Sequence, residues 1–456
     1  MMKKGEVWCK IGFNIMDYVI NNFIKPGMGR SREIWEHTGF QKYFRNTGWM
    51  FGGRIFILVI SFAVSIYIAR YLGPSNYGLF NYAVSFAGLF GFLSSLGLDN
   101  ILNREIVKDH GKKDKLIGTS FYLKLVGSGL AIVTIFIISI FTTNDPLTLI
   151  LIWLFSIRFI PASFNVLEAY FNSQVLSKKV VIPQIIAAII SAILKILLIY
   201  FDKGIFWLTV IYIVETLVIA SLLVFNYKKI GNQLSKLKFD MVVAKDLLSN
   251  SWPLILSGVA VGIYMKIDQV MIKNILGNEQ AGLYAVAVKL SEVWYFIPII
   301  ITGSVFPAII NAYKKSEEEF NKRMSKLYFL MFWSSFLIAI STTFLAEPII
   351  KILFGEAYLG SIVVLQIYVW SGIFVFLGVV VSKYLLTKNY LKISLIGTLL
   401  GSIINVLMNF VLIDRIGIQG AAISTFLSYL VPIFLVLFVH KTRNHGLLML
   451  KSIIKI

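Results

Sequence analysis

Long apolar segments separated by short polar ones run along most of this sequence. Twelve segments each hold about 20 mostly apolar residues, the length of an α-helix that crosses a bilayer. These predicted spans are 49–69, 79–98, 116–141, 148–172, 180–201, 205–227, 251–276, 281–311, 327–346, 360–386, 391–413 and 418–440. A polar stretch at 228–250 divides them into two sets of six. The pattern predicts an all-α integral membrane protein with two six-helix lobes around a central cavity.

The same pattern sets the expected domain boundaries. They are a basic cytoplasmic tail at 1–47, a first lobe at 48–230, a cytoplasmic linker at 231–250, a second lobe at 251–445 and a short cytoplasmic tail at 446–456. Polar side chains interrupt the partly apolar residues 8–24 and no small-residue cleavage site follows, so we expect no cleaved signal peptide. The N-terminal tail either lies on the membrane surface as an amphipathic helix or reflects an upstream start codon. The sequence leaves both interpretations open.

Composition supports the membrane assignment. Of the 456 residues, 57% are hydrophobic and only 14% are charged, whereas soluble domains are about 25% charged. A soluble chain this apolar has too little polar surface to stay in solution, and a bilayer covers the excess. The formal net charge of +20 would suggest nucleic acid for a soluble protein. The position of that charge along the chain decides between the two interpretations.

Lysine and arginine collect on one side of the predicted topology. With the N-terminus in the cytoplasm, 31 of the 43 lie in the tails and loops of that side, and five lie on the other. Cytoplasmic loops of membrane proteins carry such an excess. The charge therefore predicts a multi-pass protein of the plasma (inner) membrane with both termini in the cytoplasm, and it requires no nucleic acid. The outer loops are short and leave no room for an external domain.

One motif occurs twice. Residues 72–84 read LGPSNYGLFNYAV and residues 276–288 read LGNEQAGLYAVAV, with six identical positions that include two glycines. Each copy joins the first span of a lobe to the second. Six spans separate the copies, so both lobes have the same orientation. This is a parallel repeat, an arrangement that places a cavity between two similar halves.

Eleven charged residues lie inside the predicted spans, where each costs roughly 2.5–3.5 kcal/mol on insertion scales and usually faces a cavity or a partner. The candidates for binding substrate are the cations Arg54, Lys124, Arg158, Lys195, Lys266 and Lys289. The remaining cation, Lys383, and the acid Glu168 lie near span ends, from which they reach the headgroups. The candidates for a coupling ion or a counter-charge are the acids Glu215, Asp268 and Glu292. Because Lys and Arg suit phosphate, the excess of cations indicates an anionic cargo.

Some of these charges have a second interpretation. Arg54 lies only five residues into its span and can reach the headgroups instead. Lys289 and Glu292 lie three positions apart on one helical face and can neutralise each other. Lys266 and Asp268 are two positions apart, so they project from different faces of one helix. The sequence alone does not say which partner each meets.

Motifs of catalysis and metal binding are absent from the sequence. It has no P-loop, HExxH, CxxC or GxSxG, which argues against an ATPase and a membrane metalloprotease. A single cysteine, Cys9, excludes a disulfide within the chain, and the four histidines lie outside the predicted spans. We therefore expect a monomeric transporter that is not an enzyme and has no cofactor or metal.

Several short motifs together resemble those of bacterial and archaeal polysaccharide-precursor flippases. In the first half they are ARYLGP at 69–74, Tyr77-Gly78, Gly97-Leu98-Asp99 and Arg104-Glu105. In the second half they are Asp268-Gln269, Leu276-Gly277, AGLY at 281–284, VFPA at 305–308, Asn405, Asn409 and GIQGAA at 417–422. The likeness covers roughly residues 45–440. Its structural loop positions in this sequence are Arg70, Gly73, Gly78, Asp99 and Arg104.

The resemblance implies both a cargo and a mechanism. The cargo is a polyprenyl-diphosphate-linked oligosaccharide, moved from the cytoplasmic to the outer leaflet by alternating access for O-antigen, capsule or exopolysaccharide synthesis. An H⁺ or Na⁺ gradient is the implied driver, and other polysaccharide assembly proteins are the implied partners. The pyrophosphate would explain a cationic cavity.

Other transporters and membrane enzymes are the alternatives. The same superfamily, the multidrug/oligosaccharidyl-lipid/polysaccharide exporters, holds cation-coupled multidrug extruders of this architecture. These tend to carry carboxylates in the first helix, where this chain has Arg54 and no acid. A membrane glycosyltransferase or polymerase needs acidic residues in sizeable loops, and the outer loops here are too short. A major-facilitator transporter has a basic loop motif that residues 100–115 do not match.

Overall fold

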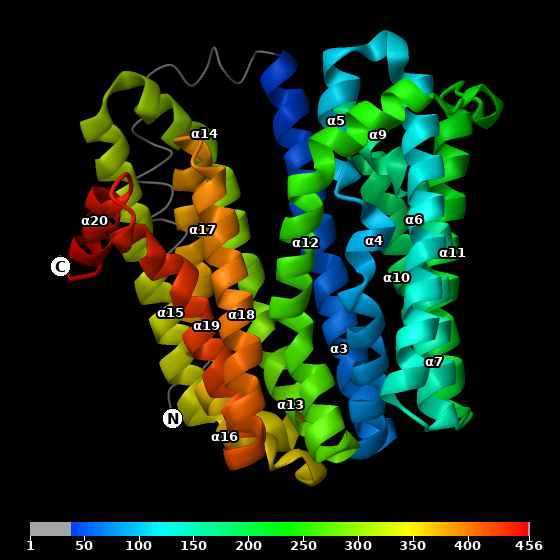
Figure 1. The fold of residues 1–456 in the computed structure, drawn as a ribbon, viewed down its shortest axis with the longest axis vertical. Helices are drawn as coiled ribbons and strands as arrows, with labels where there is room; N and C mark the ends of the chain where they lie inside the picture. Colours follow the sequence, from blue (N-terminus) through cyan, green and yellow to red (C-terminus); the bar gives the residue numbers. More distant parts are fainter. Residues whose placement is uncertain (1–37, 455–456) are drawn as a thin grey trace, which may run out of the picture.

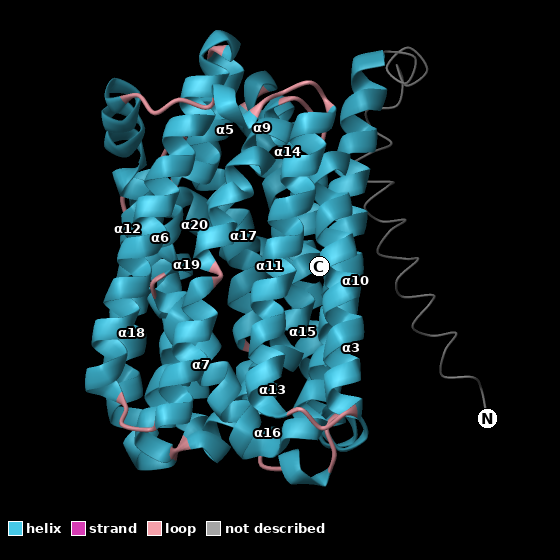
Figure 2. Ribbon diagram, turned by 90° about the vertical axis from the view of Figure 1, so that its right-hand side faces the viewer, coloured by secondary structure: helices cyan, strands magenta, loops and turns pink. Residues whose placement is uncertain are grey.

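The computed structural model describes residues 38–454, with side chains from residue 46 onward, and every regular element in this range is a helix (Figures 1 and 2). Of the predicted N-terminal tail at 1–47, residues 1–37 lie outside the described residues, and the rest forms the start of the first helix, at Thr38. The first lobe holds α3 (Thr38–Leu89), α4 (Gly91–Ser95), α5 (Leu98–Lys108), η3 (His110–Lys112), α6 (Lys113–Thr142), α7 (Pro146–Ile157), α8 (Phe159–Ala162), η4 (Ser163–Asn165), α9 (Val166–Ser173), α10 (Lys178–Tyr200) and α11 (Gly204–Lys229).

The second lobe follows the turn η5 (Leu234–Lys236). It holds α12 (Met241–Leu276), α13 (Asn278–Glu292), η6 (Val293–Tyr295), α14 (Phe296–Lys315), α15 (Glu317–Leu353), η7 (Glu356–Tyr358), α16 (Ser361–Tyr368), α17 (Ser371–Thr387), α18 (Leu391–Ile416), α19 (Ile418–Phe438) and α20 (Arg443–Ile454). Several crossings are made of two or three consecutive helices, such as α7 to α9 and α13 with α14.

Eleven helical segments among the described residues are long and apolar enough to cross a membrane. The first of them, Asn46–Leu89, contains the first predicted span and part of the second. As a straight helix its 44 residues would extend about 66 Å, roughly twice the thickness of a bilayer core. The helix breaks at Gly73, where φ is 68° and ψ is 171°, a conformation that glycine adopts without strain. The chain turns back there (Figure 1), so these segments make the twelve predicted crossings.

The two ends of the helices differ in charge. We call one end the basic face, because it carries the loops in which the sequence places most of the lysines and arginines; α5 and α9 lie there, at the top of Figure 1. The other end, the opposite face, carries Gly73, the start of α13 and α16. The long helical segments run between these two faces, as two bilayer-crossing bundles require.

The two lobes meet through α3, α12 and α13. Their closest approach joins Gly78 and Gly282, which are equivalent positions of the repeat. A Cβ added to Gly78 would lie 1.8 Å from the carbonyl oxygen of Asn278, and one added to Gly282 would lie 1.9 Å from that of Pro74. Only glycine allows this approach. The contact is reciprocal, as expected for two related segments that pack about a common axis.

Helix α12 contacts both lobes. It begins at Met241, ten residues before the predicted span, because the Asp240 carboxylate accepts hydrogen bonds from two N–H groups of its first turn. Near the basic face Leu254 of α12 packs on Gly97 of the first lobe. Further along, Tyr264 packs on Gly401 of α18. Helix α12 therefore diverges from α18 toward the basic face and crosses between the lobes (Figure 1).

Helix α20 docks on the basic-face end of the second lobe. Its His445 ring stacks on Tyr384 of α17, with ring centroids 3.4 Å apart, and its Nε2 is hydrogen-bonded to the Tyr328 hydroxyl of α15 at 2.8 Å. Burial, together with the positive charge of Lys388, lowers the pKa of His445 to about 3. The imidazole is therefore neutral at physiological pH and acts as a packing group that holds α20 in place.

Candidate functional site

A polar cavity of about 200 Å³ lies in the first lobe, at the boundary with the second. Helices α3, α10 and α11 form most of its wall, and Lys289 closes it from α13. Inside it, the Lys195 ammonium lies 3.3 Å from the Glu215 carboxylate and 3.8 Å from the ring centroid of Tyr212. Ser191 donates a hydrogen bond to the same carboxylate at 2.5 Å. The structure thus brings together three of the residues that the sequence singled out: Lys195, Glu215 and Lys289.

More charged residues continue from this cavity toward the second lobe. Arg158, at the junction of α7 and α8, lies within electrostatic reach of Glu215. Lys266 and Lys289 both lie within reach of Glu292, whose carboxylate also accepts a 3.5 Å hydrogen bond from Tyr368. We call the residues Arg158, Lys195, Glu215, Lys266, Lys289 and Glu292 the central cluster. It holds four cations and two carboxylates, so positive charge is in excess.

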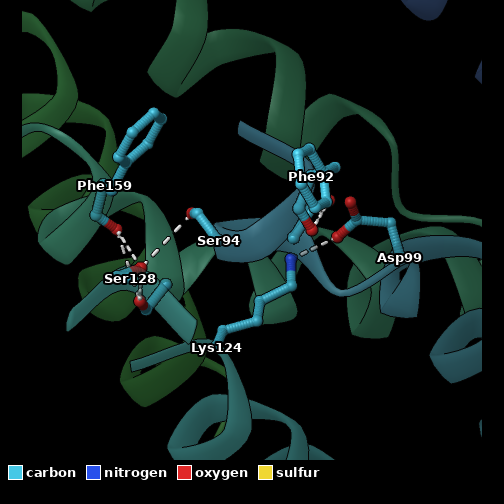
Figure 3. A network of polar contacts seen from close by, with 8 residues as sticks. Phe92, Ser94, Asp99, Lys124, Ser128 and Phe159 are labelled. Carbon is cyan, nitrogen blue, oxygen red and sulfur yellow. Dashed lines mark hydrogen bonds and ion pairs between the residues drawn. The ribbon is translucent and has the colours of Figure 1, made fainter. Parts of the chain in front are cut away.

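Lys124 belongs to a different polar group within the first lobe (Figure 3). Its buried ammonium pairs with Asp99, which the α4–α5 break presents at the start of α5. The Ser128 hydroxyl, one turn further along α6, donates to the carbonyl of Phe159 at 2.9 Å and can accept a hydrogen bond from the Ser94 hydroxyl, 3.3 Å away. Lys124 is therefore neutralised locally, apart from the central cluster.

A second polar site lies in the core of the other lobe, around Asp268. The buried carboxylate accepts hydrogen bonds from Tyr284 at 2.7 Å, from Asn409 at 2.5 Å and from Thr425 at 2.5 Å. We call these residues, together with Asn405, the Asp268 cage. Within residues 46–454 no lysine or arginine pairs with this carboxylate, and the Asn405 amide nitrogen and the Asn409 amide oxygen have no partner. The cage thus aims three hydrogen-bond donors at a single carboxylate and leaves the Asn409 amide oxygen free beside it.

Helix α12 separates these two sites. Asp268 faces α13, α18 and α19 inside the second lobe, whereas the Lys266 stem lies beside Gly88 of α3, 3.9 Å from the position of an added Cβ. The prediction that the two residues project from different faces is therefore confirmed. Because residues two positions apart on a helix project in different directions, Lys266 of α12 faces the central cluster and Asp268 faces the cage.

Two of the loop-motif residues, Arg70 and Gly78, make contacts that join the lobes at the opposite face. Arg70 donates to the carbonyls of Leu353 at 2.7 Å and Ile352 at 2.5 Å, so it caps the C-terminus of α15, where the carbonyls have no partner within the helix. Tyr358 donates to the carbonyl of Ala69 at 2.6 Å. With the packing of Gly78 on Gly282, these contacts join the lobes across the opposite face.

Two further candidates lie outside both sites. Arg54 is exposed on the basic-face half of α3. Arg104 is exposed on α5 and pairs with Glu105 at 2.8 Å. Sequence reasoning missed three hydroxyl groups that the structure adds: those of Tyr284 and Thr425 in the cage and of Tyr368 beside Glu292. Tyr284 lies in a quoted motif, but nothing in the sequence distinguishes Thr425 from the other small polar residues of its helix.

The chain is similar to proteins that are named for polysaccharide biosynthesis and for O-antigen transport. A capsular polysaccharide biosynthesis protein of Staphylococcus aureus, CapF, is 21% identical over 85% of this chain and 97% of its own length. A Shigella flexneri protein named "Putative O-antigen transporter" is 23% identical over 83% of this chain and 93% of its own length. Both relatives therefore match nearly end to end.

Two solved structures share the fold. The lipid II flippase MurJ in an inward closed conformation has a TM-score of 0.70 at 17% identity, over 89% of this chain and 91% of that one. An inward-facing multidrug transporter of the MATE family has a TM-score of 0.70 at 14% identity, over 87% of this chain and 96% of that one. This likeness shows the fold alone. The sequence profile of the family described as "Polysaccharide biosynthesis protein" matches residues 43–313, more than half of the chain, and the chain belongs to that family.

Proposed function

We propose that this protein flips a polyprenyl-diphosphate-linked oligosaccharide from the cytoplasmic to the outer leaflet of the plasma membrane, for synthesis of a surface polysaccharide. The cargo class follows from the family and from the relatives' names, "Capsular polysaccharide biosynthesis protein CapF" and "Putative O-antigen transporter". The basic face is the cytoplasmic one, since it carries the excess of lysine and arginine.

The central cluster is the observation that carries the proposal. Four cations with two carboxylates at membrane depth are expensive unless an anion offsets the excess charge. A diphosphate is such an anion, and it accepts hydrogen bonds from both ammonium and guanidinium groups. Cluster residues come from both lobes, so a bound anion would contact both and would follow their rearrangement. That is the requirement of alternating access.

The Asp268 cage is proposed as the site of the coupling ion. A buried carboxylate without a cationic partner carries a large desolvation cost, which falls when it takes up a proton or binds a cation such as Na⁺. The residues fit such an ion, because the cage offers carboxylate, amide and hydroxyl oxygens within the second lobe. A proton or cation that binds Asp268 on one face of α12 is then close to the cargo site, which lies on the other face of the same helix.

The first experiment tests the cargo. Deletion of the gene in a host without another flippase should accumulate lipid-linked repeat units in the cytoplasmic leaflet and remove the surface polysaccharide. Thin-layer analysis of extracted lipids, combined with surface labelling of the sugar, measures both. Normal surface polysaccharide in the deletion strain would exclude this function.

The second experiment tests the cluster. Alanine at Arg158, Lys195 or Lys266 should each reduce export about tenfold or more, because each removes a charge-assisted hydrogen bond worth roughly 1.5–3 kcal/mol. Lys203→Ala, at an exposed lysine of the opposite face, is the matched control and should export normally. Glu215→Gln should retain export, since it leaves the cations free for the anion. Unchanged export in all three alanine variants, with equal protein in the membrane, would remove the cluster from the mechanism.

A further inference from the structure

A second cavity, of about 510 Å³, lies in the second lobe and has the opposite chemistry. Helices α12, α14, α17, α18 and α19 form its wall together with the turn η6. Aliphatic and aromatic side chains make up most of the lining, among them Val261, Met265, Phe374, Val375 and Val379. Lys383 is the one charged residue that lines it, and its ammonium lies over the Phe306 ring at 4.8 Å. We call this space the apolar cavity.

The repeat makes the two cavities comparable. Ile60 and Ser61 line the polar cavity of the first lobe, and the residues 204 positions later, Tyr264 and Met265, line the apolar cavity. Equivalent positions of the two lobes thus line two cavities. The cavity of the first lobe has several charged groups, and that of the second lobe has one. A protein that moves a uniformly polar cargo has no need of this difference.

The central cluster lies between the two cavities. Lys289 lines the polar cavity and lies within electrostatic reach of Glu292. Glu292 in turn lies within reach of Tyr295 and Tyr429, which line the apolar cavity. The Tyr295 hydroxyl is buried and has no partner among the described residues. A molecule with an anionic group at the cluster would therefore have a polar space on one side and an apolar space on the other.

We propose that the apolar cavity holds the first isoprene units of the cargo's polyprenyl chain while the diphosphate lies at the central cluster; this rests on the proposed function. The volume of the apolar cavity lies within the range of small-molecule pockets, roughly 300–1,000 Å³. It can therefore hold only part of the polyprenyl chain, and the rest of the chain extends into the bilayer. The chain reaches the cavity between α12 and α18, which diverge toward the basic face. Val261 and Met265 of α12 and Thr398 of α18 flank this passage.

The test measures chain-length preference on the full-length protein in phosphatidylcholine nanodiscs. The probes are a long polyprenyl phosphate and methyl phosphate, which share the anionic head, but methyl phosphate has no isoprene unit to enter the cavity. Wild-type protein should bind the long probe more tightly. Val379→Trp, which fills the cavity from α17, should weaken the long probe by about tenfold, the effect of removing roughly two methylene groups from an apolar site, and leave methyl phosphate nearly unchanged. Val375→Trp, one turn away, is a second variant in case the first fails to fold.

Controls separate the possible failures. Leu407→Trp adds the same ring to the exposed side of α18, where Leu407 is 62% exposed, and should bind both probes as the wild type does. If Val379→Trp and Val375→Trp keep the wild-type preference, or weaken both probes equally, the cavity does not hold the chain, although the proposed function stands. If the wild type binds neither probe, the cargo class itself is wrong.

Discussion

Asp268 is the residue on which coupling depends in this account. Asp268→Asn keeps the size of the side chain but can take up neither a proton nor a cation, so transport driven by an ion gradient should fall by about tenfold or more. Thr425→Ser, which retains the hydroxyl that donates to Asp268, is the control and should transport normally. The measurement is cargo movement in vesicles with an imposed Na⁺ or H⁺ gradient. Gradient-dependent transport at the wild-type rate in Asp268→Asn would show that the cage is only structural.

His445 gives the docking of α20 a pH dependence with a definite sign. An unfolded histidine titrates near pH 6.5, whereas the folded pKa is about 3, lowered by burial and by Lys388. Between these values the detached state binds more protons than the docked state, so docking weakens as pH falls below about 6.5. The charged and titratable groups around the ring are Tyr328, Tyr384 and Lys388.

Hydrogen exchange of α20 measures this effect. Protection of 443–454 should be lower at pH 5 than at pH 7.5 in the wild type. His445→Phe keeps the stacking on Tyr384 and removes the titrating group, so its protection should not change between these two values. A wild-type helix that is equally protected at both would contradict the assignment.

At the scale of elements, the contact between the two copies of the repeat sets how tightly the lobes close. Gly78→Ala or Gly282→Ala places a methyl group against backbone atoms, which must separate α3 from α13. We expect a cost of about 1–3 kcal/mol and a thermal midpoint lowered by a few degrees. Gly129→Ala, on α6 with no atom within 4 Å of the added Cβ, should be neutral. Equal midpoints for all three variants in detergent would contradict the close packing.

The crossings were predictable because about 20 apolar residues in a row have few alternatives to a membrane helix. The repeat and the charged loops added the pairing and direction of the lobes. The break at Gly73 lies between the first two predicted spans, so the structure keeps them as two separate crossings. The position of Lys124 escaped prediction. It sits near the middle of its span, yet the α4–α5 break brings Asp99 to it.

The sequence predicted which charged residues would form the sites, but it did not predict which of them would lie together. Asp268 and Asn409 both stood in motifs, but 141 positions separate them, and only the packing of α12 on α18 places them together. The same holds for Lys195 and Lys289, which come from different lobes. The chemical difference between the two cavities depends on which helix faces are turned inward. No sequence pattern marked the residues of α17 as lining a cavity.

At the scale of the whole molecule, the two lobes are joined at one face, an arrangement that fits the proposed alternating access. Contacts of Arg70, Tyr358 and the glycine pair close the opposite face, while α12 leans between the lobes toward the basic face. Polar and apolar cavities then lie on either side of a cationic centre. Such a molecule is complementary to an amphipathic anion, which a lipid-linked oligosaccharide is.

The most direct test is movement of that cargo by the purified protein. Proteoliposomes would carry a polyprenyl-diphosphate oligosaccharide with a fluorescent sugar, and a membrane-impermeant quencher would report how much reaches the other leaflet. The account predicts rapid movement with the wild type, movement at least about tenfold slower with Lys195→Ala, and no acceleration of a fluorescent phospholipid. Cargo that moves no faster than in protein-free liposomes, or that moves equally fast with Lys195→Ala, would contradict it.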